Sequence, residues 1–177
     1  GELTELQRRE IEIEENIRES GYTVHRCASR NRCPLIYISV MGARPSGWGA
    51  VKGKPDNRSF KGELRNLGLL GNKRIPPAYL RGSIVQRVAL LQGMMDADGF
   101  TDAQGHCTFS NNNEAIINGV GELLASLAVR SRRTHQIDRR WTEIKTQYRI
   151  HFTAKHGFSP FRLTRKRDRV TLSAAPA

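Results

Sequence analysis

The order of expected helices and strands in residues 83–169 constrains the fold of this 177-residue chain more than any other feature. Ser83 can cap a helix that runs to about Ala97, and Gly99 follows it as a stop. Alternating residues then predict two strands, and a helix followed by two strands occurs again further on. The segment reads helix, two strands, helix, two strands, helix. This order predicts an α+β fold with helices on one face of an antiparallel sheet.

The remaining elements of this segment follow from the same two periodicities. They are strands over residues 100–102 and 105–110, a helix from Asn112 or Asn113 to Leu127, strands over 129–137 and 144–153 joined across 138–141, and a basic helix over 161–169. The middle helix has an apolar face that should enter the core, formed by Ile116, Val120, Leu123, Leu124 and Leu127.

Residues 1–80 are expected to form a smaller N-terminal part and a linker. The expected elements are a helix over 3–20, strands over 22–25 and 35–41, a loop over 42–58 rich in Gly, Pro and Lys, a helix over 60–67 and an extended connector over 73–77. The domain organisation is therefore 1–80, then 81–169, with a tail over 170–177.

The charge of the chain favours a polyanionic partner. It has 29 Lys and Arg residues against 17 Asp and Glu, a formal net charge of +12. Residues 128–169 alone hold thirteen basic and three acidic residues, so we expect the binding face in the C-terminal half. Nucleic acid is the leading candidate for the partner, and an anionic membrane surface is the lesser one.

Secretion and membrane insertion are not expected. No apolar run approaches the roughly 18 residues that a membrane span needs, and the acidic N-terminus does not resemble a signal peptide. Cys27, Cys33 and Cys107 are an odd number without a CxxC pair, which indicates reduced cytosolic thiols. His25 with the first two cysteines would still lack a fourth zinc ligand, so ordinary structural roles are favoured.

Alternation along the second hairpin concentrates basic and amide side chains on one face of the sheet. That face is expected to hold Arg130, Arg132, Thr134 and Gln136 from the first strand, and Lys145, Gln147, Arg149, His151 and Thr153 from the second. A solvated sheet face usually includes acids, and this face has almost none. The pattern therefore indicates contact with nucleic acid.

Residues 91–99 read Leu-Gln-Gly-Met-Met-Asp-Ala-Asp-Gly. This string resembles the signature motif of LAGLIDADG homing endonucleases, matching at Leu91, Gly93, Asp96, Ala97, Asp98 and Gly99. Residues 72–76, Asn-Lys-Arg-Ile-Pro, resemble the element that precedes the second such motif in intein-borne enzymes. Residues 161–166 resemble the closing segment of the same domain. The resemblance covers nearly all of residues 60–169 and implies an αββαββα endonuclease half with a saddle-shaped antiparallel sheet that binds DNA.

The residue spacing supports a close helix pair independently. Ala89, Gly93 and Ala97 recur every four residues, so one helix face is nearly bare and two such faces can pack closely. Asp98 stands at the helix end, just before Gly99. Two such helices would bring two carboxylates together, and like charges that close need a cation between them. Mg²⁺ is expected, in a shared-metal or two-metal site, because it favours one or two carboxylates together with phosphate oxygens and waters.

The resemblance implies roles for individual residues at this site. Asp98 would bind Mg²⁺ and act in catalysis; an acid at a helix C-terminus opposes the helix dipole, which disfavours the alternative of an ordinary turn residue. Lys155 would act on the attacking water or the phosphate, and the alternative is a solvated lysine. Asn111 would organise active-site water, and capping of the next helix is an equally open alternative. Asp96 is expected to support the helix end without binding metal.

Expected contacts with DNA fall into two groups. Base edges in the major groove would be read by Arg130, Arg132, Gln136, Lys145, Gln147 and Arg149. Phosphates would be contacted by Arg139, Arg140, Arg165 and Lys166, which gives an affinity that salt weakens.

Only one such motif occurs in the sequence, which leaves the partner helix open. Residues 1–80 resemble a first endonuclease half whose front is missing, so the second helix would come from residues beyond this chain or from a second protomer paired through residues 84–97. The main hypothesis is a site-specific, metal-dependent double-strand DNA endonuclease from an intein, in the cytoplasm of a bacterium or phage-infected cell. The alternative is a non-cleaving DNA- or RNA-binding derivative of the maturase or regulator kind.

Overall fold

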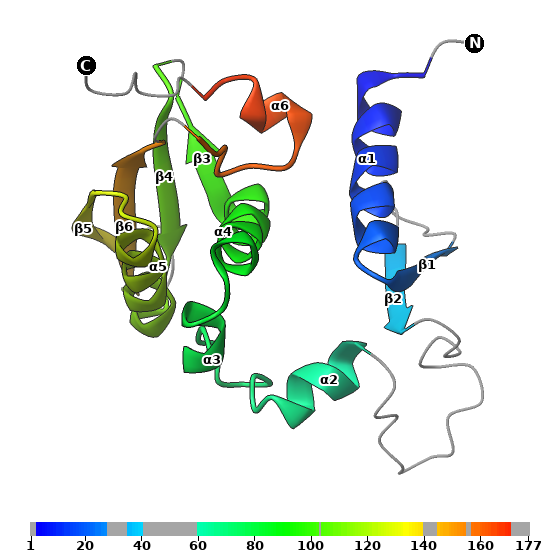
Figure 1. The fold of residues 1–177 in the computed structure, drawn as a ribbon, viewed down its shortest axis with the longest axis horizontal. Coiled ribbons are helices and arrows are strands. Elements are labelled where there is room, and N and C mark those ends of the chain that lie inside the picture. Colours follow the sequence, from blue (N-terminus) through cyan, green and yellow to red (C-terminus); the bar gives the residue numbers. More distant parts are fainter. Residues whose placement is uncertain are drawn as a thin grey trace. The chain divides into compact units, whose positions relative to one another are not determined.

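The computed structural model describes residues 3–27, 35–40, 60–102, 104–139, 145–154 and 157–170. The chain divides into two compact units, residues 1–72 and 73–177, and each is described by itself (Figure 1). The loop expected over 42–58 lies outside the described residues. Across the described residues, no helix has both the length and the apolar character that a membrane crossing requires.

The first unit holds a helix, a two-stranded antiparallel hairpin and a second helix: α1 (Glu5–Glu19), β1 (Tyr22–Cys27), β2 (Leu35–Val40) and α2 (Phe60–Asn66). Thr4 begins α1 with a capping box that it forms with Gln7, and Gly21 follows the helix with a φ of +84°. Buried Glu14 of α1 forms an ion pair with Arg26 of β1, which ties the helix to the hairpin.

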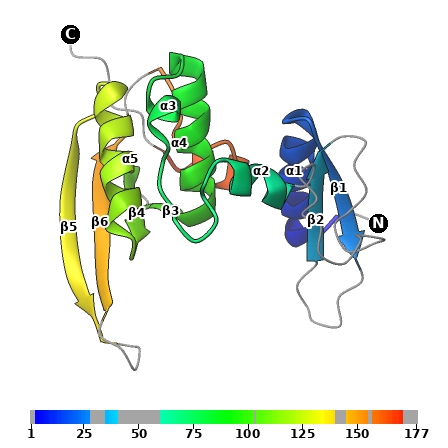
Figure 2. The same ribbon diagram turned by 90° about the horizontal axis from the view of Figure 1, so that it is seen from below.

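The second unit is one antiparallel sheet with helices on one of its faces. Its strands lie in the order β3 (Gly99–Thr101), β4 (His106–Asn111), β6 (Lys145–Thr153), β5 (Ser131–Asp138). Its helices are α3 (Pro77–Leu80), α4 (Ile84–Asp98), α5 (Glu114–Ser126) and α6 (Thr164–Arg167). The two long helices, α4 and α5, cover the same face of the sheet (Figure 2). The predicted α+β fold and order of elements are confirmed.

The core of the second unit lies between this helix layer and the sheet. Its buried side chains come from both layers: Leu91, Met95, Ile117, Val120, Leu123 and Leu124 from the helices, and Cys107, Phe109, Ile150 and Phe152 from the strands. Burial raises the pKa of the Cys107 thiol to about 11, so this cysteine is a neutral core residue at physiological pH.

The second unit begins earlier than the sequence predicts. Pro76 is extended, with φ −61° and ψ 140°, as expected for a connector, but Pro77 starts α3 because proline is tolerated in the first turn of a helix. Ile75 is buried in the core, so the connector belongs to this unit. The chain therefore divides after residue 72, ahead of the expected residue 80. The interpretation of the first unit as an incomplete endonuclease half stays a prediction.

Two helices of the second unit differ in detail from the prediction. The buried face of α5 includes Ile117, whereas Ile116 is only partly buried. The basic helix expected over 161–169 has four residues, because Phe161 and Leu163 are buried before it begins. Tertiary contacts of these two apolar side chains take precedence there over helix propensity.

Candidate functional site

Asp98 lies where α4 passes directly into β3. It is the last residue of the helix, and Gly99 opens the strand while donating its N–H to the carbonyl of Met95. A Cβ on Gly99 would lie 2.5 Å from that carbonyl oxygen, so the reversal of the chain needs glycine for space. Asp98 is exposed, and within the described residues its carboxylate makes no hydrogen bond or ion pair. A carboxylate in this state can bind a cation.

The donor chemistry at this position fits half of a magnesium site. A carboxylate is the hard oxygen donor that Mg²⁺ prefers, and one or two of them suffice when waters and phosphate oxygens complete the shell. No three His, Cys, Asp or Glu residues of the described segments are grouped so as to hold a metal ion. A magnesium site at Asp98 would therefore need further ligands from outside the described residues, from waters or from the substrate. Cys33, one of the three residues considered for zinc, lies outside the described residues.

Asp96, two residues earlier, is held by the C-terminal segment. Its carboxylate accepts the backbone N–H of Arg162 at 3.1 Å and that of Leu163 at 3.3 Å. This agrees with its expected role in supporting the helix end. The two acids of the motif thus have different surroundings: Asp96 is fixed by hydrogen bonds, and Asp98 is exposed to solvent.

Lys166 also contacts the end of α4. Its ammonium nitrogen Nζ donates to the carbonyl oxygens of Met95 at 2.9 Å, Asp96 at 2.8 Å and Gly99 at 2.8 Å. An ammonium has three N–H donors, and here all three are used inside the protein. Burial, together with the neighbouring Arg165 cation, lowers the pKa of Lys166, while the carboxylates of Asp96 and Asp98 act in the opposite direction. This position differs from the phosphate contact expected of Lys166.

The structure does not place the two other predicted catalytic residues, Lys155 and Asn111, at an active site. Lys155 lies outside the described residues. Asn111 ends β4, and its side-chain oxygen accepts the backbone N–H of Asn113 at 2.8 Å. Asn113 itself caps α5 by accepting the N–H of Ala115 at 2.9 Å. Asn111 therefore orders the turn into α5 in this structure, and its role toward active-site water stays a prediction.

The small-residue face of α4 is open. Ala89, Gly93 and Ala97 are all exposed, and a Cβ on Gly93 would meet no atom within 4 Å. Ile84 and Val85 at the start of the helix are 65% and 78% exposed. Such a face is available to a second helix.

The sheet face away from α4 and α5, called here the open face, carries the predicted basic and amide side chains. Strand pairing aligns Arg132 with His151 and Gln136 with Gln147, so these side chains share one face as alternation predicts. Gln147 accepts a hydrogen bond from Gln136 at 3.1 Å and another from Arg149 at 3.0 Å. Three of the predicted base readers therefore form one connected group.

A histidine that was not among the predicted DNA contacts links three strands of the open face. His151 of β6 is hydrogen-bonded through Nδ1 to the hydroxyl of Thr108 on β4 at 3.0 Å, and through Nε2 to the hydroxyl of Thr134 on β5 at 2.9 Å. Burial lowers the pKa of His151, and the charges of Arg149 and Arg132 lower it further. Alternation alone places each side chain on this face, but only the strand order brings them together.

Four arginines and one lysine remain among the predicted DNA contacts. Arg130, Arg139 and Arg165 are exposed, and Arg140 lies outside the described residues. Lys145 stands opposite Asp138, a buried acid, at the hairpin end of the sheet.

The opposite face of the sheet confirms the predicted alternation. Arg133 points toward α5, where it pairs with Glu114 and Asn118, and its guanidinium lies 5.2 Å from the centre of the Tyr148 ring. This basic residue is therefore removed from the open face.

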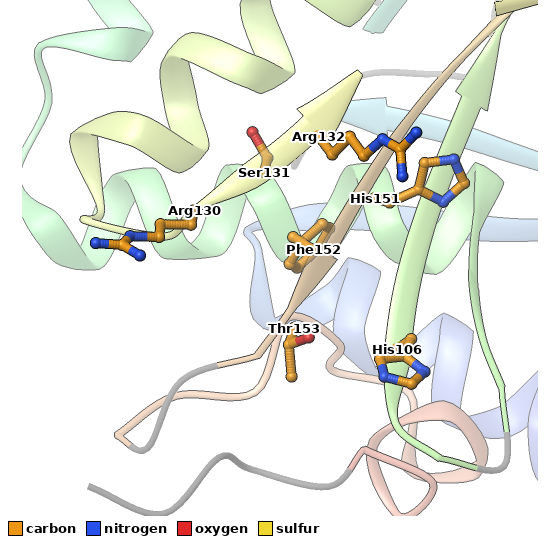
Figure 3. A pocket seen from close by; sticks show the side chains of 7 residues that line it. All are labelled: His106, Arg130, Ser131, Arg132, His151, Phe152 and Thr153. Atoms are coloured by element: carbon orange, nitrogen blue, oxygen red, sulfur yellow. The ribbon is translucent and has the colours of Figure 1, made fainter. Parts of the chain in front are cut away.

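A hollow of 480 Å³ lies where β5 begins and β6 ends, lined by His106, Arg130, Ser131, Arg132, His151, Phe152 and Thr153 (Figure 3). The Arg132 guanidinium and the His151 ring lie near each other, whereas Arg130 points away from them. Asp102 orients His106 by accepting from its Nδ1 at 3.0 Å and from its backbone N–H at 2.9 Å. The open face therefore extends beyond the predicted residues onto β4.

Helices on one face of an antiparallel sheet, a basic open face and an exposed carboxylate at a helix end define an α+β domain suited to nucleic acid. Residues 86–162, which include Asp98 and the open face, match the family described as the LAGLIDADG-like domain. This match supports the predicted resemblance to LAGLIDADG homing endonucleases, a family whose members generally bind DNA, and the predicted α+β fold class is confirmed.

The chain is also similar to the replicative DNA helicase DnaB of Mycobacterium intracellulare. The two are 46% identical over 72 residues, which cover 41% of this chain and 12% of the helicase. The chain therefore corresponds to a small part of that relative.

Proposed function

We propose that the second unit is one half of a site-specific, double-strand DNA homing endonuclease that depends on a divalent metal. The observation that carries this proposal is the exposed carboxylate of Asp98, presented at the end of the helix that carries the LAGLIDADG-like motif, in the same unit as a basic sheet face. The fold alone would support binding. The exposed carboxylate at this position supports hydrolysis of a phosphodiester bond as well as binding.

Asp98 would hold Mg²⁺ together with a carboxylate from a second LAGLIDADG helix. When bound, Mg²⁺ would supply polarisation of the scissile phosphate and activation of water. The protein's own residues would position the DNA and exclude incorrect geometries. Lys155 and Asn111 remain the proposed residues for the attacking water, on the strength of the family resemblance.

The second helix would come from residues beyond this chain or from a second protomer. The open face of small residues on α4 supports close packing of helix backbones, because Ala89, Gly93 and Ala97 add little bulk. An intein setting is supported by the similarity to a short part of a replicative helicase, since an inserted element would account for a match limited to 12% of that protein. A cytoplasmic location in a bacterium or phage-infected cell follows from this setting.

The open face would read a long DNA site. The connected group of Gln136, Gln147 and Arg149 suits base edges, because amides pair with adenine and guanidinium groups with guanine in the major groove. Arg130, Arg132 and Lys145 complete the proposed base contacts. Arg139, Arg140 and Arg165 would contact phosphates.

A non-cleaving DNA- or RNA-binding module is the second candidate. It is favoured by one observation, that the described residues contain no group of three or more His, Cys, Asp or Glu side chains that could hold a metal ion. Such a protein would keep the basic open face and the helix packing but would need no second acid.

Cleavage of a randomised supercoiled plasmid library with Mg²⁺, followed by sequencing of new ends, separates the two candidates. Specific double-strand cuts that are lost in Asp98→Asn would support the endonuclease and imply a second acid from a partner helix. Nicks that depend on Asp98 would indicate one working half. Specific, salt-sensitive binding without cuts would favour the binding module, and absence of both would refute the proposal.

A further inference from the structure

We propose that Lys166 is a positioning residue that fixes Asp98 at the end of α4. The proposal rests on the function proposed above, because it assigns a task toward the catalytic carboxylate. It also replaces the phosphate contact that charge and location in a basic segment predict for Lys166.

Lys166 donates hydrogen bonds to backbone carbonyls on both sides of Asp98. Carbonyl groups at the end of a helix are short of donors within the helix; the Met95 carbonyl accepts the Gly99 N–H and can accept a second hydrogen bond. The ammonium of Lys166 meets the carbonyls of Met95, Asp96 and Gly99 at 2.8 to 2.9 Å. Two of these residues precede Asp98 and one follows it. The backbone is therefore held on both sides of Asp98 by a single nitrogen atom.

Lys166 is itself held in place by its surroundings. Its Nζ lies 5.5 Å from the centre of the Phe161 ring, and Phe161 is 1% exposed. The segment before α6 is tied to α4 by the N–H groups that the Asp96 carboxylate accepts, and by a hydrogen bond of 2.9 Å from Gln92 to the carbonyl of Ser159. Lys166 thus reaches the end of α4 from a docked segment.

The electrostatics of this helix end favour a nearby cation. The C-terminus of a helix carries partial negative charge, which an acid makes worse and a cation relieves. Lys166 supplies that cation within the protein, which offsets the unfavourable position of the exposed Asp98 carboxylate at the helix end. The exposed state of Asp98 and the internal position of Lys166 are two parts of one arrangement.

The test compares Lys166→Met, which keeps the stem but removes the ammonium, with Lys166→Arg, which keeps the charge. Arg167→Met is the matched control, since Arg167 is exposed on the same short helix and its side chain forms an ion pair with Asp168. In the full chain with Mg²⁺, Lys166→Met should lower kcat for cleavage by about tenfold or more, since displacing a catalytic group by about 1 Å can cost a hundredfold. The Kd for DNA should stay within about twofold of the wild type.

Three results would separate the possible roles. A loss of DNA affinity with a shallower salt dependence, restored by Lys166→Arg, would mean a phosphate contact and overturn the proposal. Equal losses of kcat, DNA affinity and melting temperature would mean a general structural role and would also overturn it. A loss of kcat alone that Lys166→Arg does not restore would support it, because one planar guanidinium cannot aim three N–H bonds from one nitrogen at three carbonyls.

A measurement without cleavage tests how Lys166 holds the end of α4 separately from the endonuclease assignment. The amide hydrogen of Gly99 is bonded to the Met95 carbonyl, so its exchange with solvent reports the end of α4. In Lys166→Met the Gly99 amide should exchange about tenfold faster, with α5 amides unchanged, and in Arg167→Met it should not. Unchanged exchange at Gly99 would overturn the positioning role even if the protein cleaves DNA.

Discussion

Replacing Gly99 by alanine is expected to destabilise the second unit severely. The φ of −84° and ψ of 155° at Gly99 suit alanine as well as glycine, so backbone strain is not the cause. The added Cβ would lie 2.5 Å from the carbonyl oxygen, 2.7 Å from the Cα and 2.7 Å from the Cε of Met95. The Cε can rotate away, but the two backbone atoms cannot. The turn from α4 into β3 must open, which should cost about 2–4 kcal/mol through overpacking and a weakened hydrogen bond.

The matched control is Gly93→Ala in the same helix. A Cβ there would meet no atom within 4 Å, so only helix propensity changes, and the unit should gain about 1 kcal/mol. Thermal unfolding followed by far-UV circular dichroism measures the melting temperature of both variants. Since 1 kcal/mol shifts the melting temperature of a domain of this size by about 4–8 °C, the two alanine variants should melt at least about 12 °C apart. Equal melting temperatures for Gly99→Ala and the wild type would refute the steric argument.

Two further predictions concern the open face. Gln147→Ala removes the acceptor that Gln136 and Arg149 share. It should relax base preference by about 1–3 kcal/mol at one position of the DNA site and leave the salt dependence of Kd unchanged. Binding to DNA sites with single base substitutions measures both quantities. Burial, then the charges of Arg149 and Arg132, lower the pKa of His151, so the folded protein binds fewer protons than the unfolded chain. The free energy of unfolding should therefore fall as pH drops below about 6.5, and it should fall less in His151→Gln. Urea unfolding between about pH 5 and 7 measures this difference. Identical pH dependence in the wild type and the variant would contradict the prediction.

The sequence predicts the secondary structure of the second unit well because its signals are local. Ser83 caps α4 with Gln86 in a reciprocal box, and the alternation along β5 and β6 correctly separates Arg132 from Arg133. These outcomes depend on hydrogen bonds and side-chain directions within a few residues. Where a contact is distant in sequence, the prediction fails. The short α6 is an example, since burial of Phe161 among core residues distant in sequence delays the start of the helix to Thr164.

The open face illustrates the same limit at the level of the sheet. Thr108, His151 and Thr134 each have the polarity and parity of an exposed strand position, and nothing in the sequence alone makes them neighbours. They meet because β6 lies between β4 and β5. A basic face could be predicted from the second hairpin, whereas its extension onto β4 required the strand order.

The different fates of Asp96 and Asp98 are where structure adds most to the motif. Both are carboxylates in the last turn of α4, two residues apart, and their chemistry is identical. Backbone N–H groups from residues 162 and 163 use the oxygens of Asp96, and Lys166 neutralises the helix end from inside the protein. Asp98 is then the acid that keeps its oxygens for a ligand. A motif read as a string cannot make this distinction, because the groups that decide it come from more than sixty residues away.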